Sequence, residues 1–92
     1  MTTRITGIAL ECYVLTCLNV CDMQGGEMYG AQILRTTSPR LSIDSTEIYV
    51  VLNKLATEGK IIKRPDVQNG VYCEPCRITP LGKKWLKSFL KA

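Results

Sequence analysis

The sequence predicts a mainly helical fold that is completed by a small β-hairpin, and three features lead to this class. Apolar residues recur at spacings of three and four in four segments, which is the pattern of helices that bury one face. A short β-branched run at 60–64 precedes an Asn-Gly dipeptide at 69–70, a pair typical of tight hairpin turns. The 92 residues suit one domain, expected over 1–92, and no internal repeat competes with it.

The first two helices are expected at about 6–22 and 28–36. Glycines after Gln24 supply a stop for the first helix. In the second helix, Gly30 costs up to about 1 kcal/mol relative to alanine, which is tolerated where another backbone packs closely. The apolar faces are expected to comprise Ile8, Ala9, Cys12, Val14, Leu15, Leu18 and Cys21 in the first helix, and Tyr29, Ile33 and Leu34 in the second.

The third helix is expected over 45–58 and is the most regular of the four. Asp44 followed by Glu47 has the spacing of a capping box, in which Asp44 accepts from the Glu47 amide and Glu47 reaches back. Gly59 marks the end of the helix. The core face is expected to contain the apolar residues that repeat at helical spacing, namely Ile48, Val51, Leu52 and Leu55.

A hairpin and a fourth helix follow the third. The strands are expected at 60–64 and 71–79 with a turn at 65–70, and Pro75 marks an edge strand or a bulge. Thr79 is the expected cap and Pro80 the first residue of the last helix, with apolar residues Leu81, Trp85, Leu86, Phe89 and Leu90 facing one way. The order helix-helix-helix-strand-strand-helix is that of a winged helix-turn-helix.

The net charge of +4 is unevenly distributed along the chain. Residues 1–53 contain three basic and five acidic side chains, a net charge of −2. Residues 54–92 contain nine basic and three acidic ones, a net charge of +6. The asymmetry favours an anionic partner for the C-terminal half, with a solvated lysine-rich face as the alternative.

The composition argues against several classes of protein. There is no histidine and the carboxylates are scattered, so we expect no catalytic site, no metal site and no cofactor. The five cysteines are an odd number, which favours reduced thiols over a secreted disulfide framework. Glu11 interrupts the apolar N-terminal stretch and no cleavage site follows it, so a cytoplasmic protein without membrane spans is expected.

Three sequence motifs, taken in order, resemble one family. Residues 28–34, Met-Tyr-Gly-Ala-Gln-Ile-Leu, are similar to a GYEL-type second helix. Residues 46–55 and 58–61 are similar to a GTLYPAL stretch followed by EGLI, and residues 77–83 resemble YRLTPAGR. Over roughly 8–90 the chain therefore resembles the PadR-like winged helix-turn-helix transcriptional regulators. This resemblance implies a DNA-binding dimer that is held together by its N-terminal and C-terminal helices.

In a helix-turn-helix protein the third helix enters the major groove of DNA. With the core face expected above, Ser45, Thr46, Tyr49 and Asn53 point outward. The first two could bond to bases or to a phosphate near the helix N-terminus, Tyr49 to a phosphate, and Asn53 to adenine. The alternative is an ordinary polar surface with Tyr49 half buried.

The wing is expected to contribute Lys63 and Arg64 from one strand and Arg77 from the other. Basic side chains on a hairpin follow the phosphates or enter the minor groove. Arg35 and Arg40, before the third helix, are further candidates for phosphate contacts. The alternative is that the wing lysines discourage edge-to-edge aggregation of the strands.

Cys73 and Cys76 form a C-x-x-C motif in the returning strand, where the family typically has a plain basic and aromatic strand. A zinc site needs about four ligands, which this chain does not offer at suitable spacings. One hypothesis is a redox pair whose oxidation alters the DNA contact. The other is an incidental edge strand.

The dimer interface implied by the resemblance would use Leu15 and Leu18 of the first helix with Trp85 and Phe89 of the last. The last helix is short here, so dimerisation is expected to depend more on the first helix. We expect Trp85 and Phe89 to be buried against the first helix or against a symmetry mate. The alternative that the resemblance implies is an aromatic-lined dimer pore for flat ligands, which the short last helix disfavours.

These observations predict a sequence-specific DNA-binding transcriptional regulator. It would act as a homodimeric repressor on a pseudo-palindromic operator in double-stranded DNA, with a small molecule as a possible effector. The alternative is a winged-helix protein-interaction module, such as an anti-repressor or an assembly factor, that does not bind DNA on its own. Salt-dependent binding to duplex DNA separates the two.

Overall fold

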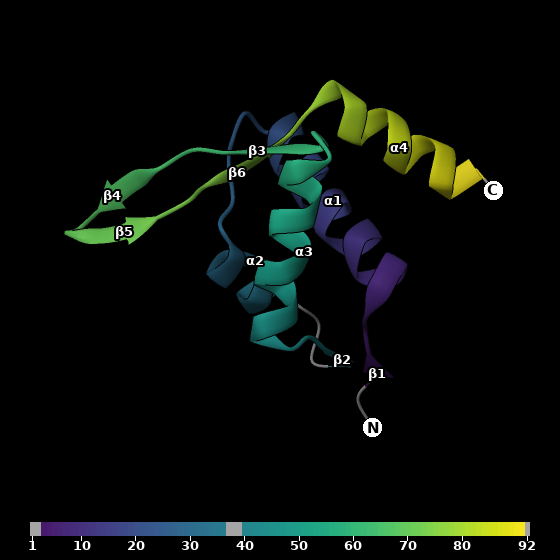
Figure 1. Ribbon diagram of the computed structural model, residues 1–92, viewed down its shortest axis with the longest axis horizontal. Helices are drawn as coiled ribbons and strands as arrows, with labels where there is room; N and C mark the ends of the chain where they lie inside the picture. The colour runs from purple at the N-terminus through teal and green to yellow at the C-terminus, as the bar shows by residue number, and fades with distance from the viewer. Residues whose placement is uncertain (1–2, 37–39, 92) are drawn as a thin grey trace.

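Four helices and a long hairpin make up most of the computed structural model, which describes residues 3–36 and 40–91 (Figure 1). The helices are α1 (Gly7–Met23), α2 (Gly30–Thr36), α3 (Ser45–Thr57) and α4 (Pro80–Lys91). The hairpin comprises β3 (Ile61–Lys63) and β4 (Asp66–Gln68), followed by β5 (Val71–Cys73) and β6 (Cys76–Ile78). The predicted class, mainly helical with a hairpin between the third and fourth helices, is confirmed. In the described part of the chain, no helix is long and apolar enough to cross a membrane.

The hydrophobic core lies between α1, α3 and the base of the hairpin, where α1 contacts α3, α4 and β6. All the predicted core residues of α3 are buried, as the helical spacing of its apolar residues required. The buried apolar residues of the core are Leu10, Val14, Leu15, Leu18, Ile33, Ile48, Val51, Leu52, Leu55, Ile61, Cys76, Ile78 and Leu86.

The buried face of α1 differs from the prediction. Leu10 and Glu11 are buried, whereas Ile8 and Ala9, which were expected inside, are exposed. The helix is apolar around most of its circumference, so the spacing alone could not select the face that meets α3. The buried Glu11 carboxylate accepts a hydrogen bond from Lys54 Nζ of α3 at 3.0 Å, and this ion pair offsets the cost of burying the acid.

The segment between α1 and α2 pairs with the hairpin. Met28, expected to begin the second helix, instead exchanges backbone hydrogen bonds with Cys76 of β6, at 3.2 Å and 2.6 Å. The helix therefore begins only at Gly30. This long-range pairing has no local sequence pattern, because it depends on the hairpin lying beside the segment (Figure 1).

Gly30 lies where α2 meets α3. A Cβ atom at this position would lie 2.7 Å from Cε1 of Tyr49 and 3.3 Å from Cδ1 of Leu52, both side-chain atoms of α3. The sequence predicted that another backbone packs closely here, but the close neighbours are side chains of α3, so the glycine makes room for the Tyr49 ring.

The N-terminus of α3 is capped by Asp44. Its Oδ1 accepts hydrogen bonds from the backbone N–H of Thr46 at 2.7 Å and of Glu47 at 3.3 Å. This half of the predicted capping box is confirmed. The Glu47 carboxylate accepts from Arg4 Nη2 at 2.7 Å, and Arg4 belongs to β1 (Thr3–Arg4), which pairs in parallel with β2 (Leu41–Ser42). This short pair of strands was not predicted from the sequence.

Replacing Asp44 with alanine is expected to lower the melting temperature at neutral pH, because two amides of α3 lose their acceptor. The amides of Thr46 and Glu47 hold the pKa of the Asp44 carboxyl below its ordinary value. A lowered folded-state pKa means that the carboxylate stabilises the fold above its unfolded-state pKa and stops doing so as the pH falls through the folded-state value. Thermal melts at decreasing pH should therefore show the difference between wild type and Asp44→Ala closing in acid. Asp44→Asn, which keeps a capping oxygen, is the matched control, and a difference that stays constant with pH would contradict the assignment.

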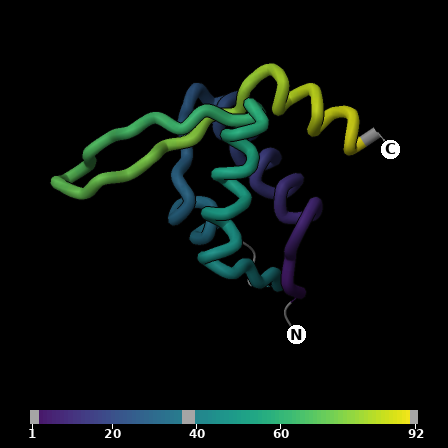
Figure 2. Tube along the Cα trace, in the orientation of Figure 1, coloured from purple at the N-terminus to yellow at the C-terminus, as the bar shows by residue number. Residues whose placement is uncertain are grey.

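The hairpin extends away from the helices as a two-stranded wing (Figure 2). β3 pairs with β6 near the helices and β4 pairs with β5 at the tip, both antiparallel. Asn69 and Gly70 form the turn with positive φ values of 52° and 76°, so the predicted Asn-Gly turn is confirmed. The turn predicted at 65–70 was too long, because 66–68 continue the strand. Pro75 interrupts the returning strand between β5 and β6, as a residue without an N–H group must.

The last helix begins as predicted. The Thr79 hydroxyl accepts from the Gly82 N–H at 3.1 Å, and Pro80 is the first helical residue. Of the five apolar residues expected to share a face, Leu86 is buried and Trp85 is half-buried, whereas Leu81, Phe89 and Leu90 are exposed. Most of the apolar face of α4 is therefore open to solvent in the single chain.

Candidate nucleic-acid interface

The outward face of α3 contains the four polar residues predicted to contact DNA. Ser45, Thr46, Tyr49 and Asn53 are all exposed, and the Tyr49 side chain retains 50% of its accessible surface. They are exposed because the buried residues at 48, 51, 52 and 55 turn the opposite face of the helix into the core. The orientation needed for base contacts is therefore present.

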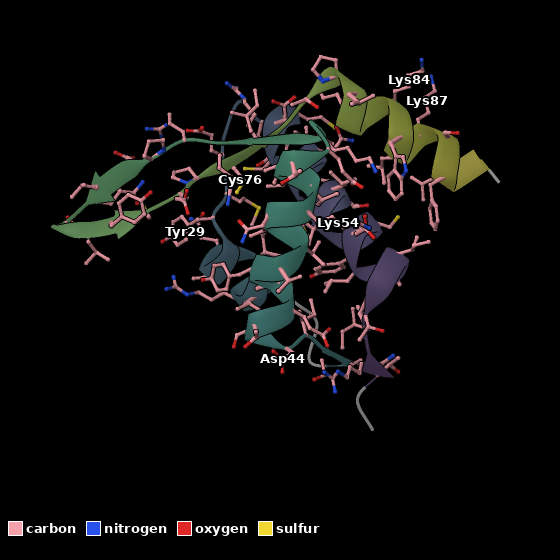
Figure 3. The ribbon with its side chains drawn as sticks, viewed as in Figure 1. Tyr29, Asp44, Lys54, Cys76, Lys84 and Lys87 are labelled. Atoms are coloured by element: carbon pink, nitrogen blue, oxygen red, sulfur yellow. The ribbon has the colours of Figure 1, made fainter. Side chains whose placement is uncertain are left out.

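The N-terminus of α3 is less suited to phosphate than its sequence indicated. The backbone N–H groups of Thr46 and Glu47 already donate to Asp44. The Asp44 carboxylate lies at this end of the helix (Figure 3) and would repel an incoming phosphate. Ser45 and Thr46 would therefore bond to DNA through their hydroxyl groups rather than through the helix amides.

A cleft of about 500 Å³ lies between the wing and the adjoining faces of α2 and α3, and we call it the wing cleft. It brings together Tyr49 and Asn53 of α3, Lys63 of β3 and Arg35 of α2. Tyr29 and Tyr72 also line it, although neither was predicted from the sequence to belong to the site. Helical spacing placed Tyr29 on an apolar face, so only the tertiary structure shows that it lines the cleft beside the wing.

Lys63 and Asn53 are in direct contact across the wing cleft, since Lys63 Nζ donates to the Asn53 amide oxygen Oδ1. This contact connects the wing to the outward face of α3. It places a positive charge beside the side chain that is best suited to contact adenine. The amide oxygen keeps a second lone pair, so the contact with Lys63 leaves the amide able to accept from a base.

Arg64 is held by acidic partners on the protein. Its guanidinium donates to the Glu27 carboxylate at 2.8 Å and 3.4 Å and lies 3.4 Å from Asp66 Oδ2. Glu27 raises the pKa of Arg64, which stays charged. A phosphate would have to compete with these carboxylates, so Arg64 is a weaker candidate than Lys63.

Arg77 does not lie with Lys63, although both belong to the wing. In the β3–β6 ladder Lys63 pairs with Cys76 and Arg77 pairs with Ile62, so successive side chains place Arg77 on the opposite face. Arg77 Nε donates to Asp22 at the end of α1, at 3.2 Å. The wing therefore presents Lys63 and Arg77 to different surfaces, and the contact of each with DNA stays a prediction.

The two arginines before α3 lie in different places. Arg35 is exposed and lines the wing cleft, and its contact with phosphate stays a prediction. Arg40 is exposed next to β2, and its carbonyl oxygen accepts from the Thr3 N–H at 2.8 Å. Only Arg35 is thus placed together with Asn53 and Lys63.

Cys73 and Cys76 differ in their surroundings. Cys73 is half-buried, whereas Cys76 is 1% exposed and its Sγ donates to the Glu74 carbonyl at 3.4 Å. Burial raises the pKa of the Cys76 thiol to about 11. Because thiol–disulfide exchange needs a thiolate, this environment weakens the redox hypothesis.

The burial of Cys76 predicts slow alkylation. At pH 8 a thiol whose pKa is raised from 9.0 to about 11 has roughly a hundredfold less thiolate, so Cys76 should react with iodoacetamide about a hundredfold more slowly in the folded than in the unfolded chain. Mass spectrometry of peptides from timed labelling measures this ratio, with Cys73 as the internal control. Rapid labelling of Cys76 in the native protein would show that the wing opens readily at this strand.

Two of the four predicted dimer residues are unavailable. Leu15 and Leu18 are 0% and 1% exposed and pack in the core of the chain, so their assignment to a dimer surface was wrong. The apolar face of α1 was needed to cover α3 and the hairpin. On α4, Trp85 and Phe89 stack with their ring centroids 5.4 Å apart, and Lys60 Nζ lies 4.4 Å from the Trp85 ring centroid. The neighbouring Leu90 is 65% exposed, so the open apolar surface belongs to α4.

The architecture and the site together define a class. Three helices followed by a two-stranded wing, with polar residues on the outward face of the third helix, are the features of a winged helix-turn-helix protein.

The comparison with solved structures narrows this class. No protein-family model and no curated protein sequence matches the chain. A PadR-family transcription regulator from Clostridium difficile is similar over 89% of this chain and 83% of its own, with a TM-score of 0.70 and 16% identity. A transcriptional regulator from Clostridium thermocellum is similar over 88% and 78%, with a TM-score of 0.71 and 25% identity. PadR from Bacillus subtilis, solved in complex with operator DNA, is similar over 88% of this chain and 47% of its own, with a TM-score of 0.69 and 26% identity. The chain thus has the winged-helix fold of PadR-family transcription regulators, and the resemblance predicted from its motifs is confirmed.

Proposed function

We propose that this protein is a DNA-binding transcriptional regulator that uses α3 and the wing cleft to bind duplex DNA. The observation that supports it most directly is the contact between Lys63 of the wing and Asn53 of α3. This contact places on one surface a cation that would bind a phosphate and an amide that would contact a base. The solved structures with this fold include transcription regulators, one of them bound to operator DNA. We therefore favour a regulatory role on DNA in the cytoplasm over a catalytic role.

The proposed contacts fall into two groups. Asn53 and Tyr49 would lie in the major groove, with the hydroxyls of Ser45 and Thr46 near the helix N-terminus. Lys63 and Arg35 would contact phosphates on either side of the wing cleft. Arg64, Arg77 and Arg40 contribute less, because the first two are engaged in ion pairs and the third lies outside the cleft.

The proposed regulator is a homodimer that represses from a pseudo-palindromic operator. The exposed apolar face of α4, with Trp85 and Phe89 at its centre, supports α4 as the dimer surface. A two-fold dimer would present two copies of α3 to successive major grooves, which gives the operator its symmetry.

A titration of binding to random duplex DNA at increasing salt tests the proposal. Each phosphate contact should add about 0.9 to the magnitude of the slope of log affinity against log salt. Selection of bound sites from a random DNA pool then tests the symmetry and spacing of the operator. The absence of binding at low salt would exclude DNA binding by the chain alone.

A protein-interaction module is the second candidate, and the wing itself favours it. Val67, Val71 and Tyr72 are exposed near the tip, and the acidic side chains of Asp66 and Glu74 lie beside them. Such a tip is apolar and acidic, which suits a protein surface better than a phosphate backbone. The random-duplex titration also decides between the two candidates.

A further inference from the structure

A second cavity, of about 430 Å³, lies between α1 and α2 and shares no lining residue with the wing cleft. We call it the α1–α2 cavity, and its volume is that of a site for a small molecule. Its walls are largely apolar and contain one aromatic ring. The lining includes Tyr13, Cys17, Val20, Cys21, Glu27 and Met28, and its other four residues are uncharged and polar.

Glu27 is the one charged residue among those that line the α1–α2 cavity in the described part of the chain. Its two oxygens accept from Arg64 Nη2 at 2.8 Å and from Arg64 Nε at 3.4 Å. Hydrogen bonding from Arg64 lowers the pKa of the Glu27 carboxyl, so it is ionised at neutral pH. A negative charge in an apolar, partly aromatic cavity is complementary to a cation with an apolar body and repels an anion.

The segment that contains Glu27 also holds the wing. Met28, the next residue, exchanges two backbone hydrogen bonds with Cys76 of β6. Cys76, labelled in Figure 3, is the residue of the wing that pairs with Met28 of this segment. Arg64 itself follows Lys63 of the wing cleft in the chain. A ligand that contacts Glu27 therefore acts on the wing through Arg64, which pairs with both Glu27 and Asp66.

We propose that the α1–α2 cavity binds a small organic monocation with an apolar body, and that this cation displaces Arg64 from Glu27. The displaced Arg64 guanidinium keeps its longer contact with Asp66, at 3.4 Å, and its nitrogens that faced Glu27 can then donate to a DNA phosphate. Conversely, when Arg64 binds a DNA phosphate, Glu27 loses this partner. The affinity of the cavity for the cation then rises. By reciprocity the cation and DNA each raise the affinity of the other, by up to about fivefold, since a partly exposed ion pair is the only contact exchanged. This regulatory consequence rests on the proposed DNA binding, whereas the cation site does not.

The cation site is tested without DNA. Benzyltrimethylammonium is titrated into the full chain while amide chemical shifts are followed by NMR, and neopentylbenzene, its uncharged isostere, is the matched ligand control. We expect shifts at residues 13–36 with the cation and weaker binding of the neutral compound. Glu27→Gln should weaken cation binding by about fivefold, and Arg64→Gln, which removes the competing guanidinium, should strengthen it by about fivefold. Glu58→Gln is the control variant, because Glu58 is an exposed carboxylate that pairs with Lys60 outside the cavity. It should leave the affinity for the cation and for the neutral compound unchanged.

The opposite signs of the two variants make the result decisive. Equal binding of the cation and its isostere, shifts away from the cavity, or the same response in both variants would overturn the proposal. The second arm repeats the random-duplex titration with and without the cation. Cation binding without DNA binding would refute the proposed function and leave the site intact, whereas DNA binding without a cation response would refute the coupling.

Discussion

Replacing Gly82 with alanine is expected to lower the free energy of unfolding by about 1–3 kcal/mol, the usual cost of forcing an extra methyl group into a packed site. A Cβ at this position would lie 2.2 Å from the carbonyl oxygen of Lys60 and 2.9 Å from Cγ1 of Ile78. The Lys60 oxygen is a backbone atom that accepts from the Thr79 N–H at 3.0 Å, so it cannot move without disturbing the base of the wing. α4 must therefore shift away from Lys60, the residue before β3, and from Ile78 of β6.

The sign of this effect is what makes it informative. Helix propensity alone predicts the reverse, since alanine is more favourable than glycine inside a helix by about 1 kcal/mol. Ser88→Ala, at an exposed position of the same helix, is the matched control and should be neutral or slightly stabilising. Urea denaturation of the three proteins measures the difference. Equal or greater stability of the Gly82 variant would mean that α4 is not packed against Lys60.

Replacing Asn53 with alanine is expected to weaken binding to the selected operator by about 1–3 kcal/mol, or about 5-fold to 150-fold, if its amide contacts adenine. Binding to random duplex DNA should change much less, because phosphate contacts do not depend on sequence. Lys63→Ala should instead weaken binding to both DNAs and reduce the salt slope by about 0.9. Fluorescence anisotropy at several salt concentrations measures both quantities.

Two controls make the Asn53 result interpretable. Lys87→Ala removes a cation from α4, where the Lys87 side chain lies far from α3 (Figure 3), and it should leave the salt slope unchanged. The double variant of Asn53 and Lys63 should lose less than the sum of the single losses, because the two side chains contact each other. Equal losses on operator and random DNA in Asn53→Ala would show that Asn53 contacts only the backbone.

Much of the fold follows from local patterns in the sequence. α3 was predicted within one residue at its end, because its apolar spacing, its Asp44 cap and the glycine after it all agree. The Asn-Gly turn and the start of α4 at Thr79-Pro80 were predicted for the same reason. The outward face of α3, with Tyr49 and Asn53, followed directly from its buried face.

The candidate site was less predictable than the fold. Lys63 and Asn53 were both named from the sequence, but their contact depends on the angle between the wing and α3. Charge counts could not show that Arg64 and Arg77 are paired with Glu27 and Asp22, residues far away in the chain. Tyr29 and Tyr72 were missed because a tyrosine in an amphipathic pattern gives no sign of whether it lies in a core or a cleft.

By itself, then, the sequence determined the elements, their order and the outward face of α3, since capping, turn chemistry and helical spacing act over a few residues. Only the tertiary structure decided which side of α1 is buried and where α2 begins. It also decided which basic side chains are held in ion pairs and which can bind a ligand. Leu15 and Leu18 were expected at a dimer surface and Met28 in a helix, yet all three meet other parts of the chain. The physical reason is that the buried side of α1 and the start of α2 depend on contacts between segments far apart in sequence. One local pattern is compatible with several such contacts, so the pattern alone does not select among them.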